Sequence, residues 1–169
     1  MRDVPIREAR ICDPVGKRFP AVGRDPERTP MQWSGAGAAH SVGFSTATDT
    51  WLPIGPDFEF VNVERQTYDP RSLLSFYRRL IWYRKQALAL TRGAYRPIDG
   101  PPDTFIYLRE HAGQRLVIAL NFAGEPRRTK LDGFGSCRIE ISTDADRGAG
   151  PVTLSDFELG PVEGAILRV

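Results

Sequence analysis

The most regular hydrophobic pattern of the chain lies between residues 69 and 92, where apolar side chains recur at spacings of three and four. The apolar positions are Leu73, Leu74, Tyr77, Leu80, Ile81 and Leu88. This period places them on one face of a helix. Asp69 is a favoured amino-terminal cap, Pro70 suits the first helical position, and Gly93 is a typical stop. The sequence therefore predicts one helix over residues 69–92 with an apolar face that needs a partner.

The second half of the chain changes to short apolar runs separated by glycine, proline and aspartate. Residues 104–109 are strand-like, and the nearly continuous apolar run over 115–122 is typical of a strand covered on both faces. Residues 111–114 supply a hairpin turn between the two. Further strands are predicted near residues 126–131, 137–143, 151–154 and 162–168. This succession predicts an antiparallel β-sandwich.

Residues 1 to about 67 show neither a helical nor an alternating period and are rich in proline, glycine and charge. So long a stretch without regular elements is uncommon inside a compact domain and is typical of functional loops. Six aromatic residues are scattered through it: Phe19, Trp33, Phe44, Trp51, Phe58 and Phe60. We expect such a loop to lie on a rigid surface with its rings covered.

Composition and charge exclude several classes of protein. The 169 residues are 41% hydrophobic and 26% charged with a formal net charge of +2, which is typical of a globular protein without a basic stripe for nucleic acid. Cys12 and Cys137 lie far apart and His40 and His111 are the only histidines, so we predict two free thiols and no metal site or cofactor. We find neither a signal-like apolar start nor a run long enough to cross a membrane. We therefore expect a cytoplasmic protein.

The densest group of special residues is Gly23–Trp33, which reads Gly-Arg-Asp-Pro-Glu-Arg-Thr-Pro-Met-Gln-Trp. Its two prolines hold the preceding residues out of the helical region, so we expect an extended or turned loop that is neither helix nor strand. Two arginines, a carboxamide and a tryptophan can pair with hydroxyl groups and cover an apolar ring face. Together with Asn62-Val63-Glu64 and Asp69-Pro70-Arg71-Ser72-Leu73-Leu74, this segment resembles the α-amylase superfamily (glycoside hydrolase family 13). The resemblance is to its α-glucosidase and oligo-1,6-glucosidase group and to the related trehalose synthases.

The resemblance implies a fold class and two domains. The expected class is an α+β fragment, in which residues 1–93 form the end of a (β/α)8 barrel, with an active-site loop excursion and the final helix. Residues 94–169 are then the C-terminal antiparallel β-sandwich domain. The rest of the barrel is expected outside this chain, either as an N-terminal polypeptide partner or as part of a longer protein.

The resemblance also implies site residues. The family places an arginine of this loop against the glucosyl unit of the substrate, which points to Arg28 first and Arg24 second. The alternative is that both arginines pin the loop through backbone carbonyls or Asp25 and Glu27. Gln32 and Trp33 are interpreted as residues that pack the loop.

No catalytic residue is predicted in the chain. A retaining glycosidase needs two carboxyl groups roughly 5–5.5 Å apart, which makes nearby acids such as Asp25 and Glu27 formal candidates. In the family, however, the nucleophilic Asp and the acid/base Glu follow the fourth and fifth barrel strands, and a stabilising Asp belongs to an Asn-His-Asp motif. Neither His40 nor His111 is followed by Asp. We therefore expect the isolated chain to be inactive, and to meet an oligosaccharide substrate only in the context of the missing barrel.

Two other functions compete with this interpretation. A non-catalytic carbohydrate-binding or interaction module should show an exposed aromatic platform, for which Tyr95, Phe105 and Tyr107 are the candidates. A relative of trehalose synthase, which isomerises maltose, would share the same loop. Both alternatives stay open from sequence alone.

Overall fold

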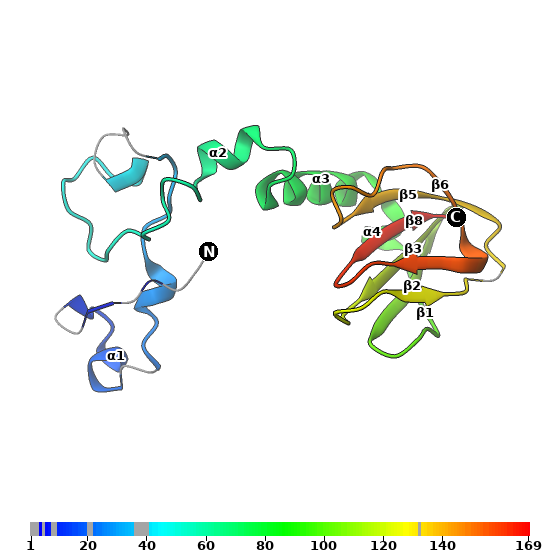
Figure 1. Cartoon of the computed structure of the whole chain (residues 1–169), viewed down its shortest axis with the longest axis horizontal. Helices are drawn as coiled ribbons and strands as arrows, with labels where there is room; N and C mark the ends of the chain where they lie inside the picture. Colours follow the sequence, from blue (N-terminus) through cyan, green and yellow to red (C-terminus); the bar gives the residue numbers. More distant parts are fainter. Residues whose placement is uncertain (1–3, 5, 8–9, 20–21, 36–40, 132) are drawn as a thin grey trace. The chain divides into compact units, whose positions relative to one another are not determined.

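The computed structural model describes residues 4, 6–7, 10–19, 22–35, 41–131 and 133–169 (Figure 1). It separates into two compact units, residues 1–75 and 76–169, called here the first and the second unit. The domains expected from the family, 1–93 and 94–169, refer to a larger architecture and stay a prediction.

The first unit consists of loops interrupted by short helices. The helices are α1 (Pro14–Arg18), η3 (Asp25–Arg28), η4 (Ser41–Gly43) and α2 (Val63–Tyr68). Few apolar side chains are enclosed in its described part, among them Val42 and Leu52. The expected irregular excursion is therefore present, but the prediction that Gly23–Trp33 contains no helix was wrong, because Asp25–Arg28 form a single 3-10 turn, η3, with Pro26 in its first positions.

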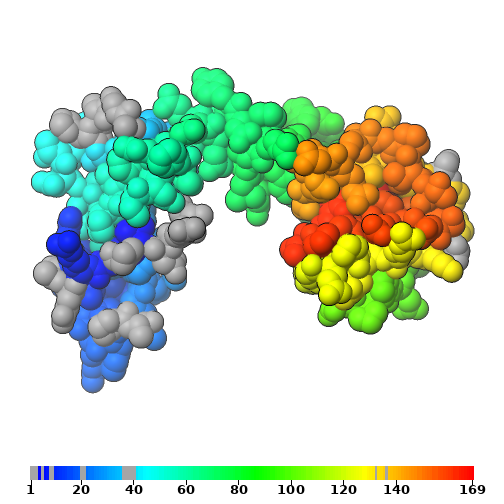
Figure 2. Space-filling view, in the orientation of Figure 1, coloured from blue at the N-terminus to red at the C-terminus, as the bar shows by residue number. Residues whose placement is uncertain are grey.

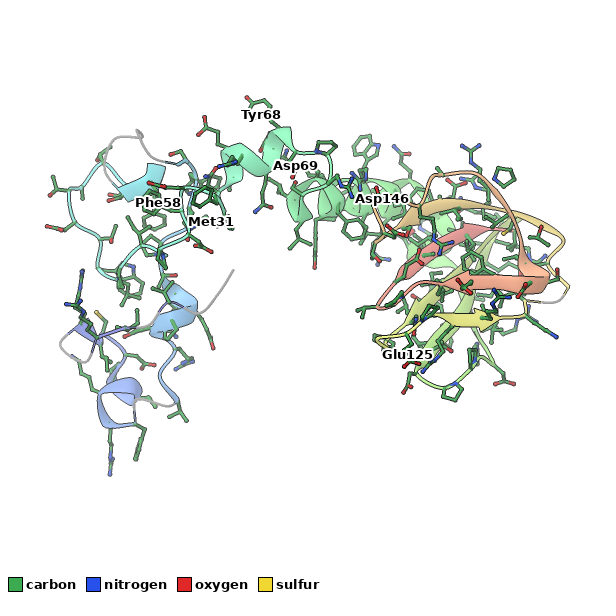
Figure 3. The ribbon with its side chains drawn as sticks, viewed as in Figure 1. Met31, Phe58, Tyr68, Asp69, Glu125 and Asp146 are labelled. Carbon is green, nitrogen blue, oxygen red and sulfur yellow. The ribbon has the colours of Figure 1, made fainter. Side chains whose placement is uncertain are left out.

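The predicted helix over 69–92 is two helices, α3 (Leu73–Gln86) and α4 (Leu88–Arg92). Asp69, labelled in Figure 3, ends α2 instead of capping α3, and its Oδ1 accepts a hydrogen bond from the backbone N–H of Arg71. Ser72 takes the capping position, since its Oγ accepts from the N–H of Ser75. The helix breaks at Ala87, whose backbone is extended, with ψ at 96°. The predicted end before Gly93 is correct.

All strand pairings in the second unit are antiparallel. A six-stranded sheet has the order β1-β2-β3-β8-β5-β6, and β4 and β7 form a second, two-stranded sheet. The strands are β1 (Ala94–Ile98), β2 (Thr104–His111), β3 (Gln114–Asn121), β4 (Arg127–Thr129), β5 (Ser136–Ser142), β6 (Pro151–Thr153), β7 (Phe157–Leu159) and β8 (Gly164–Arg168). Six of the eight correspond to predicted strands, while β1 and β7 were not predicted.

Strand β3 lies between two apolar clusters. Val117 and Ala119 face one side and pack with residues of β2, β5, β7 and β8, whereas Leu116 and Ile118 face the other side and pack with Ala87 and Ala89. The predicted double coverage of this strand is confirmed. The turn after β2 is also confirmed, with Ala112 and Gly113 at φ of 47° and 81°, the left-handed pair that a tight hairpin requires.

Candidate substrate-binding loop

Two buried carboxylates organise the loop that carries the candidate arginines. Asp25 begins η3, and its Oδ2 accepts hydrogen bonds from the backbone N–H groups of Cys12 (2.6 Å) and Asp13 (2.9 Å). The Asp25 side chain is almost fully enclosed, so it ties residues 12–13 to the start of η3 from inside the loop. Asp25 therefore has a structural position, and the formal pairing with exposed Glu27 as catalytic acids is not supported by it.

Asp13 fixes the other side of the same loop. Its Oδ1 caps α1 by accepting from the N–H of Val15 at 3.0 Å, and its Oδ2 accepts from the N–H of Arg24 at 2.9 Å. The backbone N–H of Arg24, followed by that of Val15, holds the pKa of the Asp13 carboxyl below its ordinary value of 3.8 although burial opposes this. Asp13 is thus a stable anion at neutral pH that positions the backbone before η3.

The two candidate arginines differ in what they contact. The Arg24 side chain turns toward the loop, with Nε 3.9 Å from Asp13 Oδ2. Arg28 is the last residue of η3 and is exposed, and among the described residues its guanidinium has neither a hydrogen-bond nor an ion-pair partner. Arg24 is thus partly engaged in holding the loop, whereas Arg28 presents a full set of donors.

Gln32 joins the arginine loop to residues 57–63. Its side-chain Nε2 donates to the backbone carbonyl of Val61 at 2.6 Å and to Asp57 Oδ1 at 3.2 Å. Its backbone carbonyl accepts a hydrogen bond from the N–H of Val63. Asn62 is also buried and caps α2 by accepting from the N–H of Arg65. These contacts agree with the packing role predicted for Gln32.

Among the described residues of the first unit most aromatic rings are exposed, and Phe58 alone of the six named above is half-buried. Trp33 is 49% exposed and Trp51 55% exposed, contrary to the expectation of rings tucked beneath the loop. Phe19, Phe44 and Phe60 are exposed to a similar or larger extent. The described residues of the first unit therefore do not supply the rigid surface expected beneath these rings.

The candidate aromatic platform is only partly open. Tyr107 is the middle ring of the three, with its centroid 5.3 Å from that of Tyr95 and 5.2 Å from that of Phe105. Tyr95 is 51% and Phe105 46% exposed, but Tyr107 packs against the cluster around Leu116 and Ile118. The Tyr107 ring is tilted by 40° from that of Tyr95 and by 43° from that of Phe105, so the rings do not form a flat surface.

The other residues that the sequence analysis considered do not form a functional site among the described residues. His40 lies outside the described residues. Cys12 and Cys137 are free thiols, as predicted. Within the described ranges no cluster of acidic, histidine or cysteine side chains is arranged to hold a metal ion, and no helix has the length and apolarity needed to cross a bilayer.

Comparison with known proteins gives a consistent set of matches. Residues 4–93 match the family model for the α-amylase catalytic domain. The chain is 39% identical to a probable oligo-1,6-glucosidase 2 of Bacillus subtilis over 106 residues, which is 62% of this chain and 18% of that protein. It is 33% identical to a salivary α-glucosidase of Anopheles gambiae over 166 residues, 93% of this chain and 27% of the relative. The crystal structure of a trehalulose synthase from Pseudomonas mesoacidophila superimposes on 86% of this chain and 26% of its own, with a TM-score of 0.68 and 35% identity.

The named relatives are glucosidases and a sugar synthase. The chain belongs to the α-amylase family, as the extent of the match over residues 4–93 shows. It spans only about a fifth to a quarter of the length of the curated relatives.

Proposed function

We propose that this chain is the C-terminal portion of an α-glucosidase-type glycoside hydrolase and supplies part of its substrate pocket. The observation that supports this proposal most directly is the exposure of the Arg28 side chain. Its exposed guanidinium stands on a turn held from inside by Asp25, within the segment that matches the catalytic domain. A fixed guanidinium fork of this kind can donate several hydrogen bonds to sugar hydroxyls or orient a carboxylate.

The whole enzyme would release or transfer the terminal α-linked glucose of an oligosaccharide. Its expected mechanism is double displacement, in which a carboxylate displaces the leaving group from the glucosyl carbon and water or an acceptor then displaces the carboxylate. The nucleophile, the acid/base and the stabilising acid would come from barrel residues that this chain does not contain. Arg28 would bind the glucosyl unit, and the 169-residue chain alone would have no turnover.

The same proposal assigns the two structural parts. The helix α3 would be the last helix of the barrel, and the second unit would contain the C-terminal β-sandwich domain. The exposed α3 residues Leu73, Tyr77 and Ile81 follow one another at spacings of four and so share one helix face. This face would pack against the barrel, whether the barrel belongs to the same polypeptide or to a partner.

The test is a chimaera with the Bacillus relative. Residues 4–169 would replace the matching C-terminal part of the oligo-1,6-glucosidase, and cleavage of nitrophenyl α-glucoside and isomaltose would be measured. Turnover above that of the truncated relative alone supports the proposal. A folded chimaera without turnover, beside an active unmodified relative, would overturn it, as would glucose release by the isolated chain.

A second candidate within the same chemistry is isomerisation of a disaccharide. It is favoured by the structural likeness to the trehalulose synthase, at a TM-score of 0.68. Product analysis of the active chimaera with maltose and sucrose separates the two. Free glucose as the main product supports hydrolysis, and a rearranged disaccharide supports isomerisation.

A further inference from the structure

A pocket of about 380 Å³ in the second unit has no part in the proposed function of Arg28. It lies between the C-terminal half of α3 and β5 with the segment that follows it. Figure 2 shows the green atoms of α3 against the orange atoms of that segment, and Figure 3 labels Asp146 in it. The volume is within the range of small-molecule sites, roughly 300–1,000 Å³.

The helix wall of the pocket combines an aromatic face with polar groups. Arg79, Trp82, Tyr83 and Gln86 line it, at helix spacings of three, four and seven, so they share one face. Trp82 is 65% exposed, an unusual degree for an indole. The Gln86 amide has no side-chain hydrogen bond to a described residue. Burial raises the pKa of the Tyr83 phenol, so its hydroxyl stays protonated at neutral pH.

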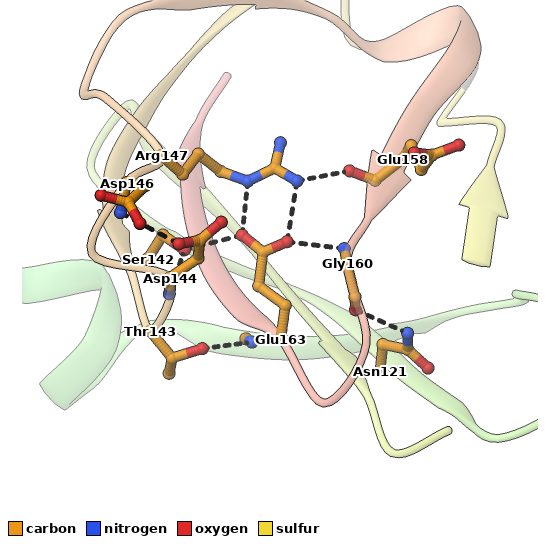
Figure 4. Close-up of polar contacts among 10 residues, drawn as sticks. Asn121, Ser142, Thr143, Asp144, Asp146, Arg147, Glu158, Gly160 and Glu163 are labelled. Atoms are coloured by element: carbon orange, nitrogen blue, oxygen red, sulfur yellow. Dashed lines mark hydrogen bonds and ion pairs between the residues drawn. The ribbon is translucent and has the colours of Figure 1, made fainter. Parts of the chain in front are cut away.

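The opposite wall is held rigidly by ion pairs. Arg147 lines the pocket and binds the buried carboxylate of Glu163, with Nη2 2.8 Å from Oε2 (Figure 4). Ser142 donates its hydroxyl to the same carboxylate at 2.6 Å. Glu140 is paired with Arg168 at 2.9 Å. The wall therefore keeps its shape before any ligand arrives.

The charge balance of the pocket favours a neutral ligand. The charged residues that line it are two arginines and two carboxylates: Arg79, Arg147, Glu140 and Asp144. Arg147 and Glu140 are already neutralised by internal partners, so an ionic ligand would gain little there. The other two charged residues, Arg79 and Asp144, are opposite in sign, and beside them the pocket presents the indole face of Trp82 and the amide of Gln86.

We propose that this pocket binds a neutral saccharide, whose apolar C–H face stacks on Trp82 while its hydroxyl groups hydrogen-bond with Gln86 and the polar rim. An exposed aromatic ring beside uncharged donors and acceptors suits a ligand that is apolar on its faces and polar at its edge. The choice of a saccharide over other neutral ligands rests on the proposed function. The site lies within residues 79–149, so binding there does not need Arg28 or a barrel.

The experiment is a titration of the 169-residue chain with maltose and isomaltose, followed by calorimetry and by the indole N–H signals in a nitrogen–proton spectrum. The chain has three tryptophans, Trp33, Trp51 and Trp82, and single Trp→Phe variants assign the signals. The expected result is a saturable shift of the Trp82 signal with millimolar affinity. Inorganic phosphate at the same concentration should leave that signal unchanged.

Matched variants decide the outcome. Trp82→Ala should weaken binding at least roughly tenfold and Gln86→Ala about threefold to tenfold, whereas Trp51→Ala, at a similarly exposed indole, should have no effect. If Trp82→Ala disturbs the fold, the Gln86→Ala variant and the signal of Trp82 in the unmodified chain carry the test. Absence of a saturable Trp82 shift, equal binding by Gln86→Ala, or a shift caused by phosphate overturns the proposal. The chimaera assay is independent of these readouts, so failure of either proposal is seen separately.

Discussion

The carboxylate of Glu163 forms a two-point ion pair with the guanidinium of Arg147, with Oε1 2.5 Å from Nε and Oε2 2.8 Å from Nη2 (Figure 4). The hydroxyl of Ser142 and the backbone N–H of Gly160 complete the set at 2.6 and 2.7 Å. Only 2% of the Glu163 side chain is exposed, so nearly all its hydrogen bonds come from the protein. This single acid joins the end of β5, the segment after it and the turn before β8.

Removal of this acid should destabilise the second unit strongly. Glu163→Ala leaves the Arg147 guanidinium, whose side chain is 25% exposed, without its carboxylate partner, and we expect a loss of about 2–4 kcal/mol in the free energy of unfolding, below the full figure for a completely buried pair. Urea titration followed by circular dichroism measures it. Glu158→Ala is the control, because the exposed pair of Glu158 with Arg128 should contribute less than about 1 kcal/mol. Equal losses in the two variants would contradict the assigned role.

Asp25 should control the order of the arginine loop. Asp25→Ala removes the acceptor of two backbone N–H groups, and we expect a cost of about 1–3 kcal/mol for each one left unpaired. Amide hydrogen exchange should accelerate at Cys12 and Asp13. Glu27→Ala, at the neighbouring exposed acid, should leave these two rates unchanged.

The first unit should lose stability in acid through Asp13. The folded-state pKa of this carboxyl is lowered, chiefly by the N–H of Arg24, so its contribution is complete above the ordinary value of 3.8 and is lost as pH falls through the lower folded value. Asp13→Asn should flatten this part of the stability profile, measured by tryptophan emission in urea between pH 7 and 3. Asp49→Asn, at an exposed position, is the charge control. A profile in Asp13→Asn that is as steep as in the unmodified chain would argue against this assignment.

Substitutions of the two loop arginines should have different effects on the kcat/KM of the active chimaera. Arg28→Ala removes donors directed at substrate, and kcat/KM should fall on the order of 10²–10³. Arg28→Lys should not restore it, since an ammonium lacks the planar fork. Arg24→Ala should lower kcat/KM by less than about tenfold and mainly loosen the loop near Asp13. A larger effect at Arg24 than at Arg28 would reverse the assignment.

The exposed face of α3 should make the isolated chain self-associate. Leu73 is 66%, Tyr77 54% and Ile81 49% exposed, and water is a poor environment for such a face. Sedimentation velocity should show weight-average mass rising with concentration. Tyr77→Ser combined with Ile81→Lys should reduce this rise and the binding of a hydrophobic dye. Arg78→Ser, on a neighbouring polar face, should leave both unchanged.

Local patterns were sufficient to predict much of the second unit. The apolar run over 115–122 predicted a doubly covered strand because its burial depends on composition, and β3 has that burial. Strand β1 was missed because Arg96 and Pro97 give its sequence a polar character, and it is recognisable only by its pairing with β2. The break at Ala87 was also missed, because it depends on contacts with residues far away in the sequence. Gln114 Oε1 accepts from the N–H of Ala89, and Arg109 Nε donates to the carbonyl of Ala89, so distant residues shape this helix end.

The arginine loop was harder to predict in detail. Its motif indicated a family and two candidate residues, but whether Arg24 or Arg28 points inward depends on Asp13, which lies eleven residues before Arg24. No period or cap signal in the sequence connects these positions. The pocket beside Trp82 was missed because its two walls come from segments far apart in the chain. An aromatic residue between charged helix positions was the one local signal.

The order of strands in the main sheet has a consequence for synthesis of the protein. Strand β3 gains its first neighbour, β2, at once through the hairpin, but its second neighbour, β8, is translated only after β4 to β7. Until then its open edge exposes unpaired N–H and C=O groups between apolar residues, which is a template for pairing with another nascent chain. A ribosome pausing before residue 164 would prolong this vulnerable interval, during which a chaperone would have most to protect.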